Sequence, residues 1–150
     1  MTSLEGWSST IELHPRGGQS RTPYIEAVDD TTLYDRVGGG AFFAELVERF
    51  YAGVEADEVL RAMYPEDLDE PKRHLAAFLS QYWGGPRDYE LERGHPRLRM
   101  RHAPFVIDAA ARDAWLTHMS AALSSMTLGA EDRAELVAYL DMAAHQLRNT

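Results

Sequence analysis

Histidines are the side chains in this sequence best suited to chemistry, because histidine is the commonest protein ligand for metals. The chain has no cysteine, which excludes disulfides, zinc–thiolate sites, iron–sulfur clusters and cysteine nucleophiles. The histidine spacing forms neither an HExxH motif nor a pair four residues apart, which argues against a conventional zinc site. The metal chemistry that remains for a helical chain is one histidine that binds haem iron axially. The candidates are His14, His74, His95, His102, His118 and His145.

His102 has the most suitable surroundings for such a ligand. It lies in the last turn of a predicted short helix that opens near Pro96 and ends before Pro104, because the residue before a proline disfavours helix. Its Nδ1–H can donate to a carbonyl one turn back, near Leu98, which leaves Nε2 for a metal. His95 is interpreted as a capping or solvent-facing residue. On spacing alone, a lone histidine such as His102 is more often structural than a ligand.

Apolar residues recur at helical spacing along most of the chain, and strand-like alternation is weak. We therefore predict an all-α protein with about six helices and no internal repeat. Residues 1–30 lack this period and are predicted to form an extended or mobile tail before one domain over residues 31–150. Residues 87–95 are predicted to form a loop. The clearest apolar face consists of Phe43, Leu46, Val47, Phe50, Tyr51 and Val54.

The charge balance narrows the classes of partner. Of the 150 residues, 15 are basic and 24 are acidic, which gives a formal net charge of −9. This balance disfavours nucleic acid and anionic membranes as main partners. No apolar run approaches the length of a membrane-spanning helix, and the first ten residues lack the apolar stretch of a signal peptide. The sequence predicts a cytoplasmic protein, and exposed apolar helix residues allow a homo-oligomer.

Several strings together resemble a known family. The string HPRLRMRHAPF at residues 95–105 strongly resembles the proximal segment of bacterial group II truncated haemoglobins. The glycine turns at residues 38–40 and 84–86 resemble the glycine motifs of that family. The resemblance covers about residues 32–149. The other matching strings are RFY at 49–51, YPED at 64–67, QYW at 81–83, DAW at 113–115 and MAAH at 142–145.

The resemblance implies a truncated globin, which is a two-over-two helical sandwich around haem b. The four main helices would span about 41–55, 69–82, 108–127 and 131–148, in agreement with the apolar periodicity. A loop and a short helix around His102 would replace a long proximal helix. The distal histidine of longer globins has no counterpart here, because its position falls near Glu70 and Pro71.

The resemblance also implies roles for individual residues. His102 would be the proximal ligand of the iron, and Tyr51, Tyr64 and Trp115 would be polar groups on the distal side, with Leu75 lining that side. Their O–H and N–H groups would favour dioxygen over carbon monoxide, because bound dioxygen draws more electron density and gains more from a hydrogen bond. Taken singly, each aromatic residue could instead be ordinary core or loop packing.

Haem would need further contacts from the chain. Its two propionates need cations or donors at the rim of the pocket, for which Arg101 is the first choice and Tyr89 the second, with Arg97 and Arg99 nearby. A merely solvated basic face is the alternative for these arginines. Apolar walls around the ring are expected from Phe50, Leu79, Phe105, Val106, Leu116 and Met119.

Three functions follow for such a chain. The first is binding of dioxygen, carbon monoxide, nitric oxide or similar ligands, for oxygen transport, storage or sensing. The second is redox catalysis at the same iron, as nitric oxide dioxygenation or peroxide reduction. Because the chain has no flavin or nicotinamide motif, the second would need a separate reductase. The third is a helical interaction module without a cofactor, which would be colourless.

Overall fold

The computed structural model describes residues 31–150, which form helices and no strands. Our prediction of a tail concerns residues 1–30 and lies outside the described residues. None of the helices described here is long and apolar enough to cross a membrane. The helices are α4 (Leu33–Val37), α5 (Gly40–Glu55), α6 (Glu58–Arg61), α7 (Asp69–Tyr82), α8 (Asp88–Arg93), α9 (Leu98–His102), α10 (Ala109–Ser124) and α11 (Ala130–Leu147).

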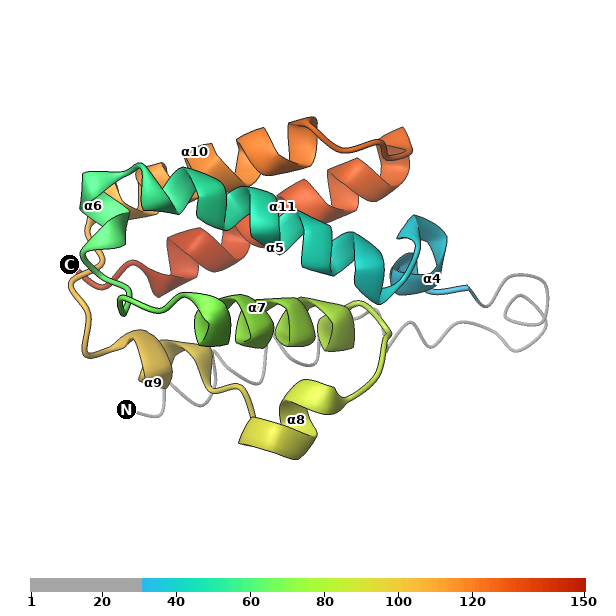
Figure 1. The fold of residues 1–150 in the computed structure, drawn as a ribbon, viewed down its shortest axis with the longest axis horizontal. Coiled ribbons are helices and arrows are strands. Elements are labelled where there is room, and N and C mark those ends of the chain that lie inside the picture. The colour runs from blue at the N-terminus through green and yellow to red at the C-terminus, as the bar shows by residue number, and fades with distance from the viewer. Residues whose placement is uncertain (1–30) are drawn as a thin grey trace.

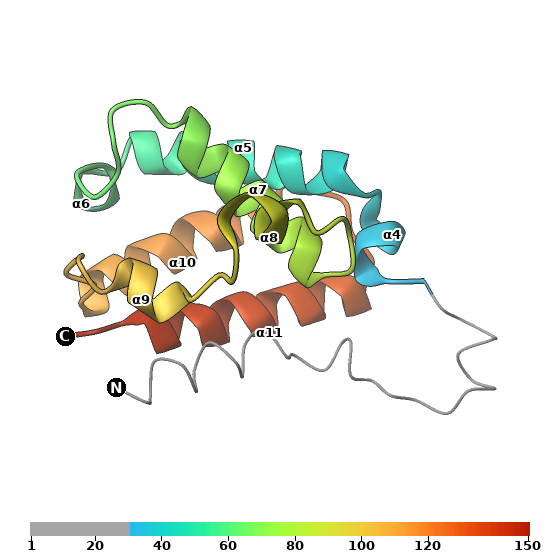
Figure 2. The same cartoon turned by 90° about the horizontal axis from the view of Figure 1, so that it is seen from below.

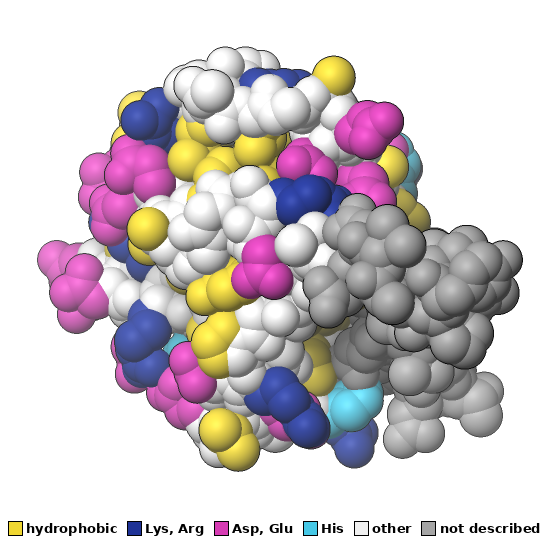
Figure 3. Space-filling model, turned by 90° about the vertical axis from the view of Figure 1, so that its right-hand side faces the viewer, with side chains coloured by type: hydrophobic (Ala, Val, Ile, Leu, Met, Phe, Trp, Pro, Cys, Tyr) yellow, Lys and Arg dark blue, Asp and Glu magenta, His cyan; other side chains and the backbone are white. Residues whose placement is uncertain are grey.

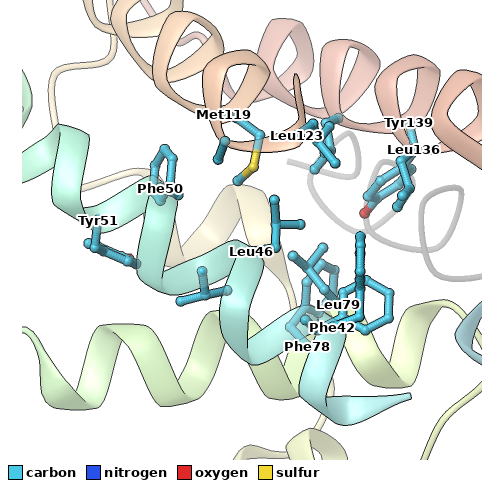
Figure 4. Close-up of a cluster of buried hydrophobic side chains, with 14 of the residues drawn as sticks. Phe42, Leu46, Phe50, Tyr51, Phe78, Leu79, Met119, Leu123, Leu136 and Tyr139 are labelled. Atoms are coloured by element: carbon cyan, nitrogen blue, oxygen red, sulfur yellow. The ribbon is translucent and has the colours of Figure 1, made fainter. Parts of the chain in front are cut away.

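Four long helices (Figure 1) build two packed layers, which lie one above the other in Figure 2. α5 packs against α7 in one layer, α10 packs against α11 in the other, and α5 and α10 also contact each other across the layers. Side chains from all four helices meet in one core, where Leu46, Met119 and Leu136 are almost completely buried (Figure 4). The predicted all-α, two-over-two architecture is therefore confirmed.

Glycine turns bring the ends of α7 and α4 together. Thr32 caps α4, because its side chain accepts from the Asp35 N–H at 3.1 Å. Gly84 has φ +108°, a left-handed conformation that suits glycine, and a Cβ there would lie 2.6 Å from the Thr32 side chain. A Cβ on Gly85 would lie 2.6 Å from the Tyr34 ring. Only glycine lets the chain leave α7 this close to α4.

The short elements correct two predictions from the sequence. Residues 88–93, predicted as loop, form α8, so the described part has eight helices rather than about six. A helix of six residues is too short to show a period, and tertiary contacts stabilise it. Tyr89 is buried against Phe78, and the Gln81 side chain accepts from the Glu90 N–H at 2.9 Å. α9 begins at Leu98 rather than at Pro96.

Charges of both signs are interspersed on the end of the molecule that carries α4 (Figure 3). Arg36 of α4 illustrates the mixing, because it lies 3.0 Å from Asp132 and 3.6 Å from Glu135 of α11. These exposed pairs are individually weak. The described residues on this face therefore present no concentrated positive field.

Candidate functional site

A cavity of about 380 Å³ lies between the helical layers. Residues from α5, α7, α9, α10 and α11 line it, together with the segment after α6. Its size and mainly apolar walls are typical of a site for a small organic molecule. The apolar lining includes Leu75, Phe78, Leu79, Ile107, Leu140 and Leu147.

One wall of the cavity carries His102, at the end of α9. Its Nδ1 lies 2.7 Å from the Leu98 carbonyl oxygen, which confirms the contact that the sequence predicted. A carbonyl only accepts, so Nδ1 carries the proton and Nε2 keeps a lone pair. Burial, and secondarily the charge of Arg101, lowers the pKa of His102 despite the opposing effect of the Leu98 bond. The imidazole is therefore neutral at neutral pH, as a metal ligand must be.

The opposite wall gathers three aromatic residues with polar tips. Tyr51 lies on α5, Tyr64 follows α6, and Trp115 lies on α10. The ring centroids of Tyr51 and Tyr64 are 5.4 Å apart, edge to face. Burial raises the pKa of both phenols, so both hydroxyls are neutral at neutral pH.

The three groups also interact. After burial, Tyr64 contributes to the raised pKa of Tyr51, whereas Tyr51 and Trp115 oppose the rise of the Tyr64 pKa. A neutral phenol can donate or accept a hydrogen bond, and an indole can only donate. This wall therefore offers three neutral donor groups to a ligand in the cavity.

Near α8 and α9, the cavity is lined by His74 and Arg101, and Arg93 lies next to both. Arg93 Nη1 lies 2.8 Å from Nδ1 of His74, and a guanidinium only donates, so the imidazole accepts and is neutral. Burial and the charges of Arg93 and Arg73 lower the pKa of His74. Arg101 Nε donates to the Pro96 carbonyl at 2.6 Å, and its Nη2 donates to the Arg93 carbonyl at 3.0 Å. Two of its three nitrogens are therefore engaged by backbone.

The structure brings most of the residues selected from the sequence together around one cavity. Phe50 and Met119 are exceptions, because they lie behind the wall. Phe50 is fully buried, with its ring centroid 4.9 Å from that of Tyr51 and 5.3 Å from that of Trp115. Val106 and Leu116 are also absent from the lining. The selected residues that line the cavity are His102, Tyr51, Tyr64, Trp115, Leu75, Leu79, Tyr89, Arg101 and Phe105.

Some lining residues were not selected from the sequence. Pro71 and His74 line the cavity from α7, beside Leu75 and Phe78. These four follow the spacing i, i+3, i+4, i+7, so extending the apolar face of α7 back by one turn would have found them. Arg112 and Tyr139 also line the cavity. No pattern around these two distinguishes them from ordinary helix residues.

One protein-family model matches almost all of the described residues. The family model described as "Bacterial-like globin" matches residues 32–149. The chain belongs to the bacterial-like globins. It is 40% identical over 132 residues to the group 2 truncated hemoglobin YjbI of Bacillus subtilis, covering 88% of this chain and 92% of the relative.

Solved structures agree with this assignment. A thermostable hemoglobin from Thermobifida fusca is 52% identical, with a TM-score of 0.79 over 80% of this chain and 98% of that chain. A hemoglobin from Chloroflexus aurantiacus is 49% identical, with a TM-score of 0.79 over 80% of this chain and 99% of that chain. The protein is thus a truncated haemoglobin similar to those of group II, as the sequence resemblance implied.

The cofactor of this globin is haem b, and the residues present fit it. The cavity holds one histidine with an unengaged Nε2 among apolar side chains. Within residues 31–150, no group of three or more His, Asp or Glu side chains could hold a metal ion. Iron carried by a porphyrin needs only one such nitrogen from the chain, so the cavity fits haem.

Proposed function

We propose that this globin binds dioxygen as its physiological ligand and retains it through a hydrogen bond from Tyr64. Haem-based binding of small diatomic ligands is the function of the family, and the choice among those ligands is made by the distal wall. The observation that supports dioxygen is that Tyr51, Tyr64 and Trp115, each with a group that can donate, line the same cavity as His102. The Tyr64 hydroxyl is neutral because burial raises its pKa, so it can donate its proton to a polar ligand in the cavity.

Each wall residue has a defined task in this proposal. Haem iron, when bound, supplies a coordination position for a diatomic molecule. His102 holds the iron through Nε2, and the Leu98 carbonyl orients its ring by accepting from Nδ1. Tyr64 donates its proton toward the ligand, while Leu75 and neighbouring apolar side chains exclude water.

A hydrogen bond from Tyr64 would be strong enough to slow the release of dioxygen measurably. A hydrogen bond to a charged or strongly polarised group is worth about 1.5–3 kcal/mol. Such a bond slows ligand release by about 10- to 150-fold, because 1.4 kcal/mol is a factor of ten. Carbon monoxide accepts hydrogen bonds poorly and gains little. A donor in the cavity therefore raises the preference for dioxygen over carbon monoxide.

Stopped-flow measurement of ligand release tests the proposal. Tyr64→Phe should release dioxygen about 10- to 150-fold faster and change carbon monoxide release much less. The matched control is Tyr89→Phe, which removes a hydroxyl from another tyrosine that lines the cavity. Unchanged dioxygen release in Tyr64→Phe would overturn the assignment of Tyr64 as the donor.

Redox catalysis is a second candidate. A donor that polarises bound dioxygen or peroxide would also assist nitric oxide dioxygenation or peroxide reduction at the haem. Tyr139 favours this function, because it lines the cavity and stacks on Tyr82 with ring centroids 4.0 Å apart, so an oxidisable pair adjoins the site. The test is the reaction of the oxygenated protein with nitric oxide, followed by re-reduction with a cell extract. Without re-reduction by a separate reductase, this function fails.

A further inference from the structure

The helix that carries His102 is short. α9 has five residues, none of which is completely buried, and Leu98 packs against the core. So short a helix is not stable through its own hydrogen bonds. Contacts with neighbouring segments must therefore hold the wall that carries His102 in place.

Asn149, which follows α11, makes these interactions. Its Oδ1 accepts from the Ile107 N–H at 2.9 Å, and its Nδ2 donates to the Phe105 carbonyl at 2.9 Å. The same Nδ2 lies 3.5 Å from the carbonyl oxygen of His102 itself. The Asn149 backbone N–H donates to the Ile107 carbonyl at 2.9 Å. One residue thus engages the segment of residues 102–107 at four points.

The chemistry of this contact requires a carboxamide. The segment presents an N–H at Ile107 and carbonyls at Phe105 and His102, so it needs an acceptor and a donor on one short side chain. An aspartate would keep the acceptor for Ile107 but would set a negative oxygen against the two carbonyls. An alanine would keep only the backbone bond.

The location of the contact links it to the iron ligand. The Phe105 N–H donates to the His102 carbonyl at 3.0 Å, so the segment closes a turn directly after the helix. α9 also contacts α11, and the two lie side by side in Figure 2. Asn149 therefore connects the end of the 18-residue helix α11 to the turn that follows the five-residue helix α9.

We propose that Asn149 is a positioning residue for His102. Its carboxamide holds residues 102–107 against the end of α11 and thereby sets the direction of the His102 ring toward the iron. This role rests on the proposed function of His102 as the axial ligand. It acts on the iron–histidine bond and leaves the distal donor Tyr64 untouched.

Two measurements on the full-length, haem-loaded protein test this role. The first is hydrogen exchange of the Ile107 amide, which reports the hydrogen bond from the Ile107 N–H to the Asn149 side chain. The second is the iron–histidine stretching band of the ferrous form in the resonance Raman spectrum, which reports ligand geometry. In Asn149→Ala, we expect Ile107 exchange to quicken by about 3- to 10-fold, the effect of one lost hydrogen bond, and the band to shift or broaden.

Two further variants sharpen the test. Asn149→Asp should keep the Ile107 amide protected but still perturb the band, because only the donor half of the carboxamide is lost. Arg148→Ala is the matched control, since among residues 31–150 its side chain donates to the nearby Thr150 carbonyl, from Nε at 2.9 Å, and not to the segment of residues 102–107. It should change neither measurement.

The outcomes are distinguishable. Faster Ile107 exchange with an unchanged iron–histidine band would overturn the positioning role, and so would an unchanged amide in Asn149→Ala. If His102→Ala leaves the absorption spectrum of the haem protein unaltered, the proposed function of His102 fails instead. Should Asn149→Ala fail to fold, Asn149→Asp decides by its band alone, and an unshifted band there overturns the proposal.

Discussion

The two walls of the haem cavity, which we propose to be its distal and proximal walls, are built on different physical principles. On the distal wall, Tyr51 is only 3% exposed and belongs to α5, a 16-residue helix that contacts α7 in its own layer and α10 in the other. Phe50 fills the space behind that wall, between Tyr51 and Trp115. On the proximal wall, α9 has only five residues, none of them completely buried. Arg101 and Asn149 donate hydrogen bonds to backbone carbonyls around it.

This difference suits the two walls to different tasks: one contributes to the stability of the fold, and the other orients the proposed iron ligand. Packing on the distal wall holds the hydroxyl and indole groups rigidly, because buried aromatic rings have few alternative positions. Hydrogen bonds on the proximal wall, such as that from His102 to the Leu98 carbonyl, orient a histidine on a helix of only five residues. Substitutions on the distal side should therefore affect the free energy of unfolding, and those on the proximal side should affect the haem.

We expect the strongest change on the proximal side, at His102. His102→Ala removes the nitrogen that we propose binds the iron, so the Soret band and the ferrous and oxygenated absorption spectra should be lost or strongly altered. The matched control is His145→Ala. His145 has the same bond to a carbonyl one turn back, with its Nδ1 2.8 Å from the Asp141 oxygen, but it lies exposed on α11. A spectrum that changes equally in both variants would contradict the assignment.

The next effect directly compares the two walls. Phe50→Ala should lower the free energy of unfolding by about 3–5 kcal/mol, the range for a fully buried phenylalanine. Phe105→Ala should lower it by less than about 1 kcal/mol, because this ring is 43% exposed. Urea unfolding of both variants without haem provides the measurement. Equal losses would show that the proximal wall is packed as tightly as the distal wall.

A smaller effect tests how closely α5 and α10 approach behind the distal wall. A Cβ on Gly53 would lie 2.5 Å from Nδ1 of His118. Gly53→Ala should therefore cost about 1–3 kcal/mol through overpacking, although alanine is otherwise the better helix former. In the double variant with His118→Ala, the alanine at residue 53 should cost nothing or stabilise. A cost that persists in the double variant would point to a cause other than this contact.

The smallest expected effect is a pH dependence near the distal wall. Asp57 Oδ2 lies 2.6 Å from His118 Nε2, and this hydrogen bond is the main cause that lowers the pKa of Asp57. A carboxyl with a lowered pKa stabilises the fold above its unfolded pKa of about 3.9, and this contribution disappears as the pH falls through the folded value.

Thermal unfolding across pH checks this dependence. Asp57→Asn keeps an N-cap for α6 but removes the charge. The wild-type protein should therefore be more stable than the variant near neutral pH, and the difference should shrink below about pH 4. A difference that stays constant across this range would exclude the Asp57 carboxylate as its source.

Much of the fold was predictable because its signals are local. The long helices follow from apolar periodicity, and their starts follow from caps such as Asp108, whose Oδ1 accepts from the Ala111 N–H at 2.9 Å. The bond from His102 to Leu98 spans one helical turn, so it was predictable as well. α8 was missed because Tyr89 is stabilised by a partner on α7, which no local pattern reveals.

The helical class, the order of the long helices and most of the side chains that line the cavity follow from the amino-acid sequence. Which side of a helix faces the cavity depends on how the helices pack. Phe50 and Tyr51 lie on one apolar stripe, yet the turn of a helix between successive residues places Tyr51 in the lining and Phe50 in the core behind it. The pairing of Asn149 with Ile107 joins residues 42 positions apart. Such contacts depend on how helices pack in space, and no period within one helix encodes them.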